Sequence, residues 1–228
     1  MTIWGLCFDL QYILKLLILQ GMDLLLQSLF KVIALLYSVV IHEVSHGAMA
    51  NALGDSTAKD AGRLSLNPLK HIDMFGSIVL PLLLFLAGSP FLVGYAKPVP
   101  YDPMRLNDRK YGPVKVAMAG PLANVILAIL FGLTLRFMPD VFSSSLVPQL
   151  FSFIVVLNLF LALFNLMPIP PLDGHWLLMT FLPPRFNVIK VFLYKYSLIL
   201  LFAFILFIFP LLLPLVAGAF KLITGVGM

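Results

Sequence analysis

Long apolar segments alternate with short polar ones along this chain. The apolar segments cover residues 4–20, 22–52, 75–95, 113–137, 147–167 and 191–215. A membrane-spanning helix needs about 20 mostly apolar residues, because the hydrocarbon core of a bilayer is about 30 Å thick. The pattern therefore predicts an all-α polytopic membrane protein, a bundle of about five to six transmembrane helices.

Composition and charge support this class. Of the 228 residues, 61% are hydrophobic and 11% are charged, which leaves too little polar surface for a soluble globule. The net charge of +5 comes from Lys and Arg residues that lie mostly in short loops between the apolar segments. That distribution favours contact with anionic lipid headgroups and orientation by the positive-inside rule. No basic run accompanies the charge, so we expect no nucleic-acid partner.

The loops on both sides of residues 75–95 are basic. A full crossing would place two basic loops on opposite sides of the membrane, against the positive-inside rule, so a re-entrant hairpin is favoured over a crossing. Just before this segment, Leu64 and Leu66 alternate with polar residues and predict a short strand near the membrane surface. Residues 54–112 are therefore expected to form a short membrane-associated strand and re-entrant region.

The second apolar segment contains the motif His42-Glu43-Val44-Ser45-His46. Residues four apart lie on one face of an α-helix, so His42 and His46 can offer two imidazoles to one metal ion. In such an H-E-x-x-H motif the histidines bind zinc and the glutamate takes a proton from zinc-bound water. The alternative is a pair of helix histidines paired with Glu43 without a metal. Ionisable groups deep in a membrane are costly, which favours a bound cation in a cavity that water can reach.

A catalytic zinc usually takes three protein ligands and one water. Asp173 is the best third candidate, because the prolines from Pro168 onwards prevent a regular helix and leave this residue on an extended segment. An ordinary turn at Asp173 is the alternative. His71 is a less favoured ligand, since a lone loop histidine is more often a surface or hydrogen-bonding residue. Asn124, within an apolar span, suits hydrogen bonding between helices better than contact with a substrate.

Two motifs, in this order on separate spans, resemble those of a known family. The first is His42 to His46, and the second is Asn165-Leu166-Met167-Pro168 followed by Pro170-Pro171-Leu172-Asp173-Gly174. Together they resemble the site-2 protease family of intramembrane zinc metalloproteases. The small-residue span with Gly120, Pro121 and Asn124 is also similar, so that the resemblance covers about residues 22–174.

The resemblance implies one catalytic Zn²⁺ held by His42, His46 and Asp173, with Glu43 as the general base. It also implies that Asn165 contacts the substrate carbonyl or its oxyanion, with Asn124 as a second candidate. The substrate would be a membrane protein or membrane peptide cleaved in or near a transmembrane segment, as in regulated intramembrane proteolysis. The strand at Leu64 to Leu66 and the re-entrant segment could hold an extended peptide by edge pairing. No segment is long enough for a PDZ domain, which indicates a compact form.

The whole chain, 1–228, is expected to be one membrane-embedded domain. Its expected parts are an N-terminal apolar helix (4–20), the H-E-x-x-H helix (22–53), the strand and re-entrant region (54–112), two core spans with the third ligand (113–174) and the C-terminal spans (175–228). The basic loops predict a multi-pass protein of the cell (inner) membrane with an active site accessible from the cytoplasmic side.

Two other functions use similar residues. A metal transporter or a non-catalytic metal-binding membrane protein could hold a cation with the same ligands, but its ionisable residues would be strung along a pathway. A prenyl-protein protease shares the two-histidine motif but typically takes a glutamate as third ligand. Glu43 is the chain's only glutamate, which excludes that class.

Overall fold

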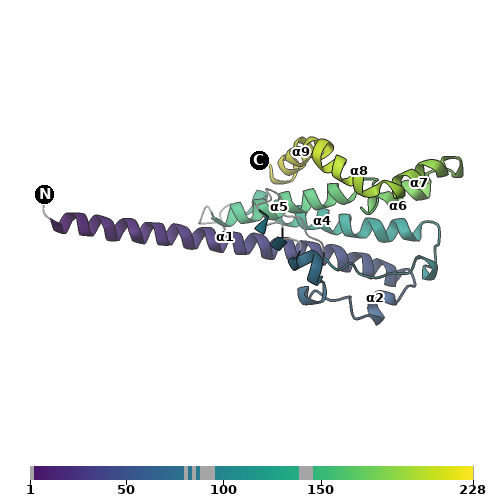
Figure 1. Cartoon of the computed structure of the whole chain (residues 1–228), viewed down its shortest axis with the longest axis horizontal. Coiled ribbons are helices and arrows are strands. Elements are labelled where there is room, and N and C mark those ends of the chain that lie inside the picture. The colour runs from purple at the N-terminus through teal and green to yellow at the C-terminus, as the bar shows by residue number, and fades with distance from the viewer. Residues whose placement is uncertain (1–2, 80–81, 84–85, 88–95, 139–145, 228) are drawn as a thin grey trace.

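Three long helices form the centre of the fold. The structure of the chain, a computed structural model, describes residues 3–79, 82, 83, 86, 87, 96–138 and 146–227 (Figure 1). Helix α1 (Ile3–Ala52) packs along α4 (Gly112–Phe137) and α5 (Leu146–Asn165), and α4 and α5 pack against each other. The predicted all-α polytopic class is confirmed.

The described residues contain fewer candidate spans than the five to six expected for the chain. Within the described residues, three helices are long and apolar enough to cross a membrane, Leu24–Ala52, Gly112–Phe137 and Leu146–Asn165. A fourth is possible if the pair Asn187–Lys195 and Ser197–Ile208, bent by 75°, counts as one. The first two apolar segments join into one helix, residues 75–95 lie mostly outside the described part, and the C-terminal segment is bent at Tyr196.

Helix α1 is continuous over 50 residues, about 75 Å, where two helices over 4–20 and 22–53 were expected. Gly21 between them does not interrupt the helix, because a single glycine costs a helix interior only about 1 kcal/mol. In Figure 1 the N-terminal part of α1 projects beyond the other helices, and its C-terminal part lies beside α4 and α5.

Short elements and irregular chain make up the described part of the region between α1 and α4. They are α2 (Thr57–Asp60), η1 (Pro68–Lys70), η2 (Met74–Val79) and η3 (Pro103–Arg105). The strand expected at Leu64 to Leu66 is not formed, because this stretch has no partner strand in the described chain and is held by other bonds. The guanidinium of Arg63 donates to the carbonyl of Lys97 at 2.7 Å, and a ring nitrogen of His71 lies 2.8 Å from the carbonyl of Ser65.

The two ends of the segment from 72 to 96 lie side by side. The backbone N–H of Lys97 donates to the carbonyl of His71 at 2.8 Å. The chain thus leaves and returns to the same end of the bundle, which is the path that a re-entrant hairpin takes. Most of the segment predicted to re-enter the membrane, residues 75–95, lies outside the described residues.

The C-terminal elements lie on the side of α4 and α5 away from α1 (Figure 1). They are α6 (Gly174–Phe181), η5 (Pro184–Phe186), α7 (Asn187–Lys195), α8 (Ser197–Ala203), η6 (Phe204–Ile208), η7 (Phe209–Leu212) and α9 (Leu213–Thr224). Helix α9 packs on α4 and α5 through a buried apolar cluster of Ala128, Val155, Leu159, Val216 and Phe220. This cluster holds α9 against the pair of helices α4 and α5. The opposite face of that pair contacts α1.

Candidate functional site

His42 and His46 lie on the face of α1 that packs against α4. Both are buried, and His46 lies six residues, about 9 Å, before the end of α1 at Ala52. The C-terminus of α1, the N-terminus of α4 and the C-terminus of α5 meet at this end of the bundle. The site therefore lies within the apolar part of the bundle but close to one of its ends.

Asp173 reaches the two histidines from a different part of the chain. Helix α5 ends at Asn165, the Pro170–Pro171 peptide bond is cis, and α6 begins at Gly174, directly after Asp173. This turn is tight: a Cβ atom on Gly174 would lie 2.1 Å from the carbonyl oxygen of Leu166. Glycine is therefore required next to Asp173, as its place in the sequence motif anticipates.

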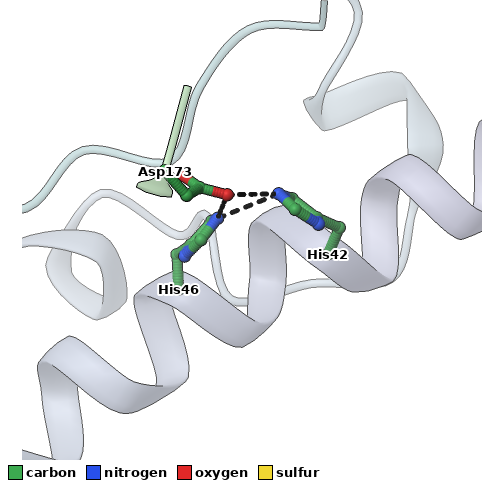
Figure 2. Close-up of side chains that lie close together, drawn as sticks. All are labelled: His42, His46 and Asp173. Atoms are coloured by element: carbon green, nitrogen blue, oxygen red, sulfur yellow. Dashed lines mark hydrogen bonds and ion pairs between the residues drawn. The ribbon is translucent and has the colours of Figure 1, made fainter. Parts of the chain in front are cut away.

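The three side chains point toward one another (Figure 2). Nε2 of His42 lies 3.1 Å and Nε2 of His46 lies 3.3 Å from Oδ2 of Asp173. The two Nε2 atoms are 3.0 Å apart. The sequence predicted this convergence of α1 and the segment after α5, and the distances agree with it.

The other ring nitrogens of both histidines are engaged behind the site. Nδ1 of His46 lies 2.8 Å from the carbonyl oxygen of Val116, and Nδ1 of His42 lies 2.5 Å from Oδ1 of Asn124. A carbonyl oxygen only accepts, so Nδ1 of His46 carries the proton and Nε2 presents a lone pair. With the same tautomer at His42, three unprotonated atoms face one another, and Oδ2 of Asp173 is buried without a hydrogen-bond donor.

This donor set fits a zinc ion. Ligand atoms placed tetrahedrally at the usual zinc distance of about 2.0–2.1 Å are about 3.3 Å apart, close to the three separations above. Two neutral imidazoles and a carboxylate are common zinc ligands, with a fourth position left for water. His42, His46 and Asp173 are the only group of three or more potential ligands that converge in this way in the described chain.

Glu43 borders the same site. It lines a cavity of about 270 Å³ together with the three candidate ligands and with Pro98, Val99, Tyr101, Asn165, Pro171 and Trp176. The backbone N–H of Val99 donates to Oε2 of Glu43 at 3.0 Å. The carboxylate is thus oriented by the loop that carries Val99, beside the place where the three candidate ligands meet.

The other sequence candidates are placed differently. Asn165 lines the cavity, and its Nδ2 donates to the carbonyl of Leu161 at 2.9 Å. Asn124 is fully buried behind His42, with Oδ1 facing His42 and Nδ2 facing Asn158, which is the helix-packing position. His71 is buried in the loop region and does not belong to the ligand group.

Sequence reasoning missed Tyr101 and the loop that carries it. Burial, together with the charges of Asp173 and Tyr194, raises the pKa of Tyr101 to about 12, so its phenol stays protonated beside the site. No spacing pattern marks Tyr101, because it reaches the cavity through loop geometry. Two prolines around Val99 were the available signal for an extended segment here.

Asp55 ties this loop to the end of α1. Its buried carboxylate accepts from the backbone N–H of Asp102 at 2.6 Å, from the backbone N–H of Thr57 at 3.0 Å and from the Thr57 hydroxyl at 2.5 Å. Burial opposes ionisation, but these donors outweigh it and lower the pKa of Asp55 below its ordinary value. The loop that carries Val99 and Tyr101 is thus fixed at both of its ends.

Comparison with known proteins connects this geometry to a family. The sequence model of peptidase family M50 matches residues 140–208, which include Asn165 and Asp173. Several relatives carry the name "Putative zinc metalloprotease". YwhC of Bacillus subtilis is 41% identical over 162 residues, 68% of this chain and 70% of that protein. Rip2 of Mycolicibacterium smegmatis is 34% identical over 66% of this chain, and MJ0611 of Methanocaldococcus jannaschii is 50% identical over 27%.

Coverage of the relatives is uneven. The matched part is 56% of the length of Rip2 and 30% of the length of MJ0611. No solved structure matches the chain.

Proposed function

Because this chain belongs to peptidase family M50, the site-2 protease family of zinc metalloproteases, we propose that it hydrolyses peptide bonds within or beside transmembrane segments of membrane proteins. His42, His46 and Asp173 hold one zinc ion, and Glu43 is the general base. The substrate is a single-span protein or a peptide that stays in the membrane, which places the reaction in regulated intramembrane proteolysis.

One observation carries this proposal most strongly. Nε2 of His42, Nε2 of His46 and Oδ2 of Asp173 lie 3.0–3.3 Å apart, and the chain's only glutamate borders the same cavity. With both imidazoles neutral and protonated on Nδ1, these three atoms are all acceptors and repel one another unless a cation lies between them. A base beside the ion suits hydrolysis, whereas a transport pathway would need ionisable groups at several depths.

Each residue of the site has a separate role in hydrolysis. Zinc, when bound, acts as a Lewis acid that lowers the pKa of a bound water towards 7 and polarises a peptide carbonyl. Glu43 accepts the proton of the attacking water and later delivers it to the leaving amine nitrogen. The N–H of Val99 holds Oε2 of Glu43, which leaves Oε1 for this transfer. The second N–H of the Asn165 amide is available to the substrate carbonyl oxygen.

The depth of the site supports a substrate inside the bilayer. His46 and His42 lie about 9 and 15 Å before the end of α1, within a candidate membrane span. A helical substrate hides its carbonyls in its own hydrogen bonds, so the cleaved part must unwind before it reaches the cavity. The basic loops near the site end of the bundle favour the cytoplasmic side for this opening.

The test uses the full chain in liposomes with a single-span peptide as substrate. Glu43→Gln should keep its zinc, measured by metal analysis, and lose about 10²-fold or more in cleavage rate, because only the base is removed. Asp60→Asn makes the same chemical change at an exposed acid away from the site and should leave cleavage unchanged. Undiminished cleavage by Glu43→Gln would refute the proposed base, and zinc flux without any cleavage by the unaltered protein would favour transport.

The orientation of the protein in the membrane can be tested by thiol labelling, because the chain has only one cysteine to remove beforehand. In a Cys7→Ser background, Lys59→Cys places one thiol on the exposed helix α2, close to the end of α1 that carries the site. A membrane-impermeant maleimide should label it only after the cells are permeabilised. Labelling of intact cells would place the site on the outer side.

A further inference from the structure

A chain of buried hydrogen bonds joins the three core helices behind His42. Nδ2 of Asn124 on α4 donates to Oδ1 of Asn158 on α5 at 2.7 Å. Nδ2 of Asn158 donates to the carbonyl of Ile154 at 2.9 Å and to the hydroxyl of Ser38 on α1 at 3.0 Å. Asn124 and Asn158 are fully buried, and Ser38 is 4% exposed.

Such a series of buried hydrogen bonds is an unusual way to pack an apolar bundle. Burial of amide groups is unfavourable unless each polar atom is hydrogen-bonded, and apolar residues of similar size would pack the same space without that requirement. Here the oxygen and the nitrogen of both amides are engaged. One end of the chain is the candidate ligand His42, which points to a role beyond packing.

The carbonyl of Ile154, at the end of the hydrogen-bond series away from His42, fixes which group donates and which accepts in each bond. The carbonyl of Ile154 can only accept, so the NH₂ group of Asn158 must face it and Oδ1 must face Asn124. Asn124 must then donate with its NH₂ group, which turns its own Oδ1 toward His42. An oxygen without a proton facing Nδ1 requires the proton on Nδ1. In the neutral ring, Nε2 of His42 is consequently left with its lone pair toward His46 and Asp173.

We propose that Asn158 is a positioning residue for the metal centre: through Asn124 it keeps the proton of His42 on Nδ1 and so holds Nε2 ready to bind zinc. The proposal rests on the proposed metalloprotease function. His46 obtains the same tautomer directly from the carbonyl of Val116. Nδ1 of His42 faces the side chain of Asn124 instead, and is connected to a backbone carbonyl only through the two asparagines.

Asn158→Leu tests this role, because leucine has a similar size but has no polar group that could orient the amide of Asn124. The first readout is the tautomer of His42 in zinc-free protein, from NMR of ¹⁵N-labelled histidine assigned with His42→Gln. The second is the zinc dissociation constant, from competition with a chelator. We expect a mixture of tautomers and a zinc affinity about 10- to 100-fold weaker, as is typical for loss of a group that orients a metal ligand. Asn158→Ala serves in its place if the leucine variant does not fold.

Two further variants separate positioning from packing. Asn158→Asp keeps an acceptor toward Asn124 in either protonation state, so it should preserve the His42 tautomer and most of the zinc affinity although it destabilises the bundle more than leucine does. Ser38→Ala should have a small effect, because the carbonyl of Ile154 still sets the direction. Val155→Ala removes buried packing on the same helix and should lower stability while leaving both readouts unchanged.

The proposal is overturned if the Asn158→Leu or Asn158→Ala protein keeps the Nδ1 tautomer and the zinc affinity, or if Val155→Ala weakens zinc binding equally. Neither readout involves a substrate. A protein that fails to cleave membrane peptides would therefore refute the proposed proteolysis without changing the tautomer result.

Discussion

A Cβ atom on Gly120 would lie 2.4 Å from Nε2 of His46, the ring nitrogen that faces Asp173. The same atom would lie 2.7 Å from Cε1 of His42. Helix α4 therefore approaches α1 so closely that the two imidazoles rest on the bare backbone of Gly120. The space needed by the candidate ligands is created by the absence of a side chain.

Gly120→Ala should displace both imidazoles. Overpacking a fixed site costs about 1–3 kcal/mol, and we expect zinc affinity to fall about tenfold or more, with a matching loss of cleavage at limiting zinc. Metal competition measures the first effect. Gly218→Ala is the matched control, because a Cβ at Gly218 in α9 would meet no atom within 4 Å. It should be neutral or slightly stabilising, and equal zinc affinity in both variants would contradict the close contact.

Val99→Pro removes the backbone N–H that donates to Glu43. The side chain of Glu43 would then lose its fixed orientation, and we expect kcat to fall about tenfold, because general bases act only at hydrogen-bonding distance in the correct geometry. Zinc content should stay unchanged. Val99→Ala keeps the N–H but loses buried methyl groups, so it separates orientation from packing. A rate loss of the same size in the alanine variant would assign the effect to packing.

Tyr101→Phe should lower kcat/KM about tenfold or less while zinc binding is retained, because it removes only a neutral donor beside the cavity. The raised pKa of Tyr101, about 12, keeps the phenol protonated up to about pH 10. Wild type and variant should therefore share the same alkaline limb in a plot of rate against pH. An alkaline limb that disappears in Tyr101→Phe would show that this phenol ionises in the working range.

Asp55 makes the attachment of the loop sensitive to acid. Its folded-state pKa lies below the unfolded value of about 3.9, so its ionised form stabilises the loop above that pH and the stabilisation disappears as pH falls further. Hydrogen exchange of residues 96–106, relative to the intrinsic rate at each pH, should rise below about pH 4 in the wild type. In Asp55→Ala it should already be raised at pH 7. Exchange that is equal at pH 7 in both proteins would show that Asp55 does not anchor the loop.

The site could be predicted to the extent that it depends on spacing along one helix. His42 and His46 share a face because they are four residues apart, and Asp173 follows a span that runs back to the same end. The features that complete the site depend on how helices pack: the carbonyl of Val116, the bare backbone of Gly120 and the relay through Asn158. Of these, Gly120 left a signal in the sequence as part of a small-residue span, and Asn158 left one as a polar residue inside a mostly apolar span.

The fold was harder to predict where the polypeptide leaves regular helices. Hydrophobicity located the spans that begin near Pro113 and Val147 within one or two residues. It could not show that α1 runs through Gly21, because one glycine is a weak interruption. The alternation around Leu64 predicted a strand, but a strand also needs a neighbour, and here side chains such as Arg63 satisfy the backbone instead.

The segment from Lys97 to Pro100 along the cavity has no free backbone donor. The N–H of Lys97 is bound to His71, that of Val99 is bound to Glu43, and Pro98 and Pro100 have none. An unfolded peptide that lies along this segment can donate hydrogen bonds to it but can receive none. Because it offers no backbone donors, such an edge cannot form a regular β-sheet with an arbitrary peptide. Selection of the peptide would then depend on its side chains and on how readily its helix opens, more than on its backbone.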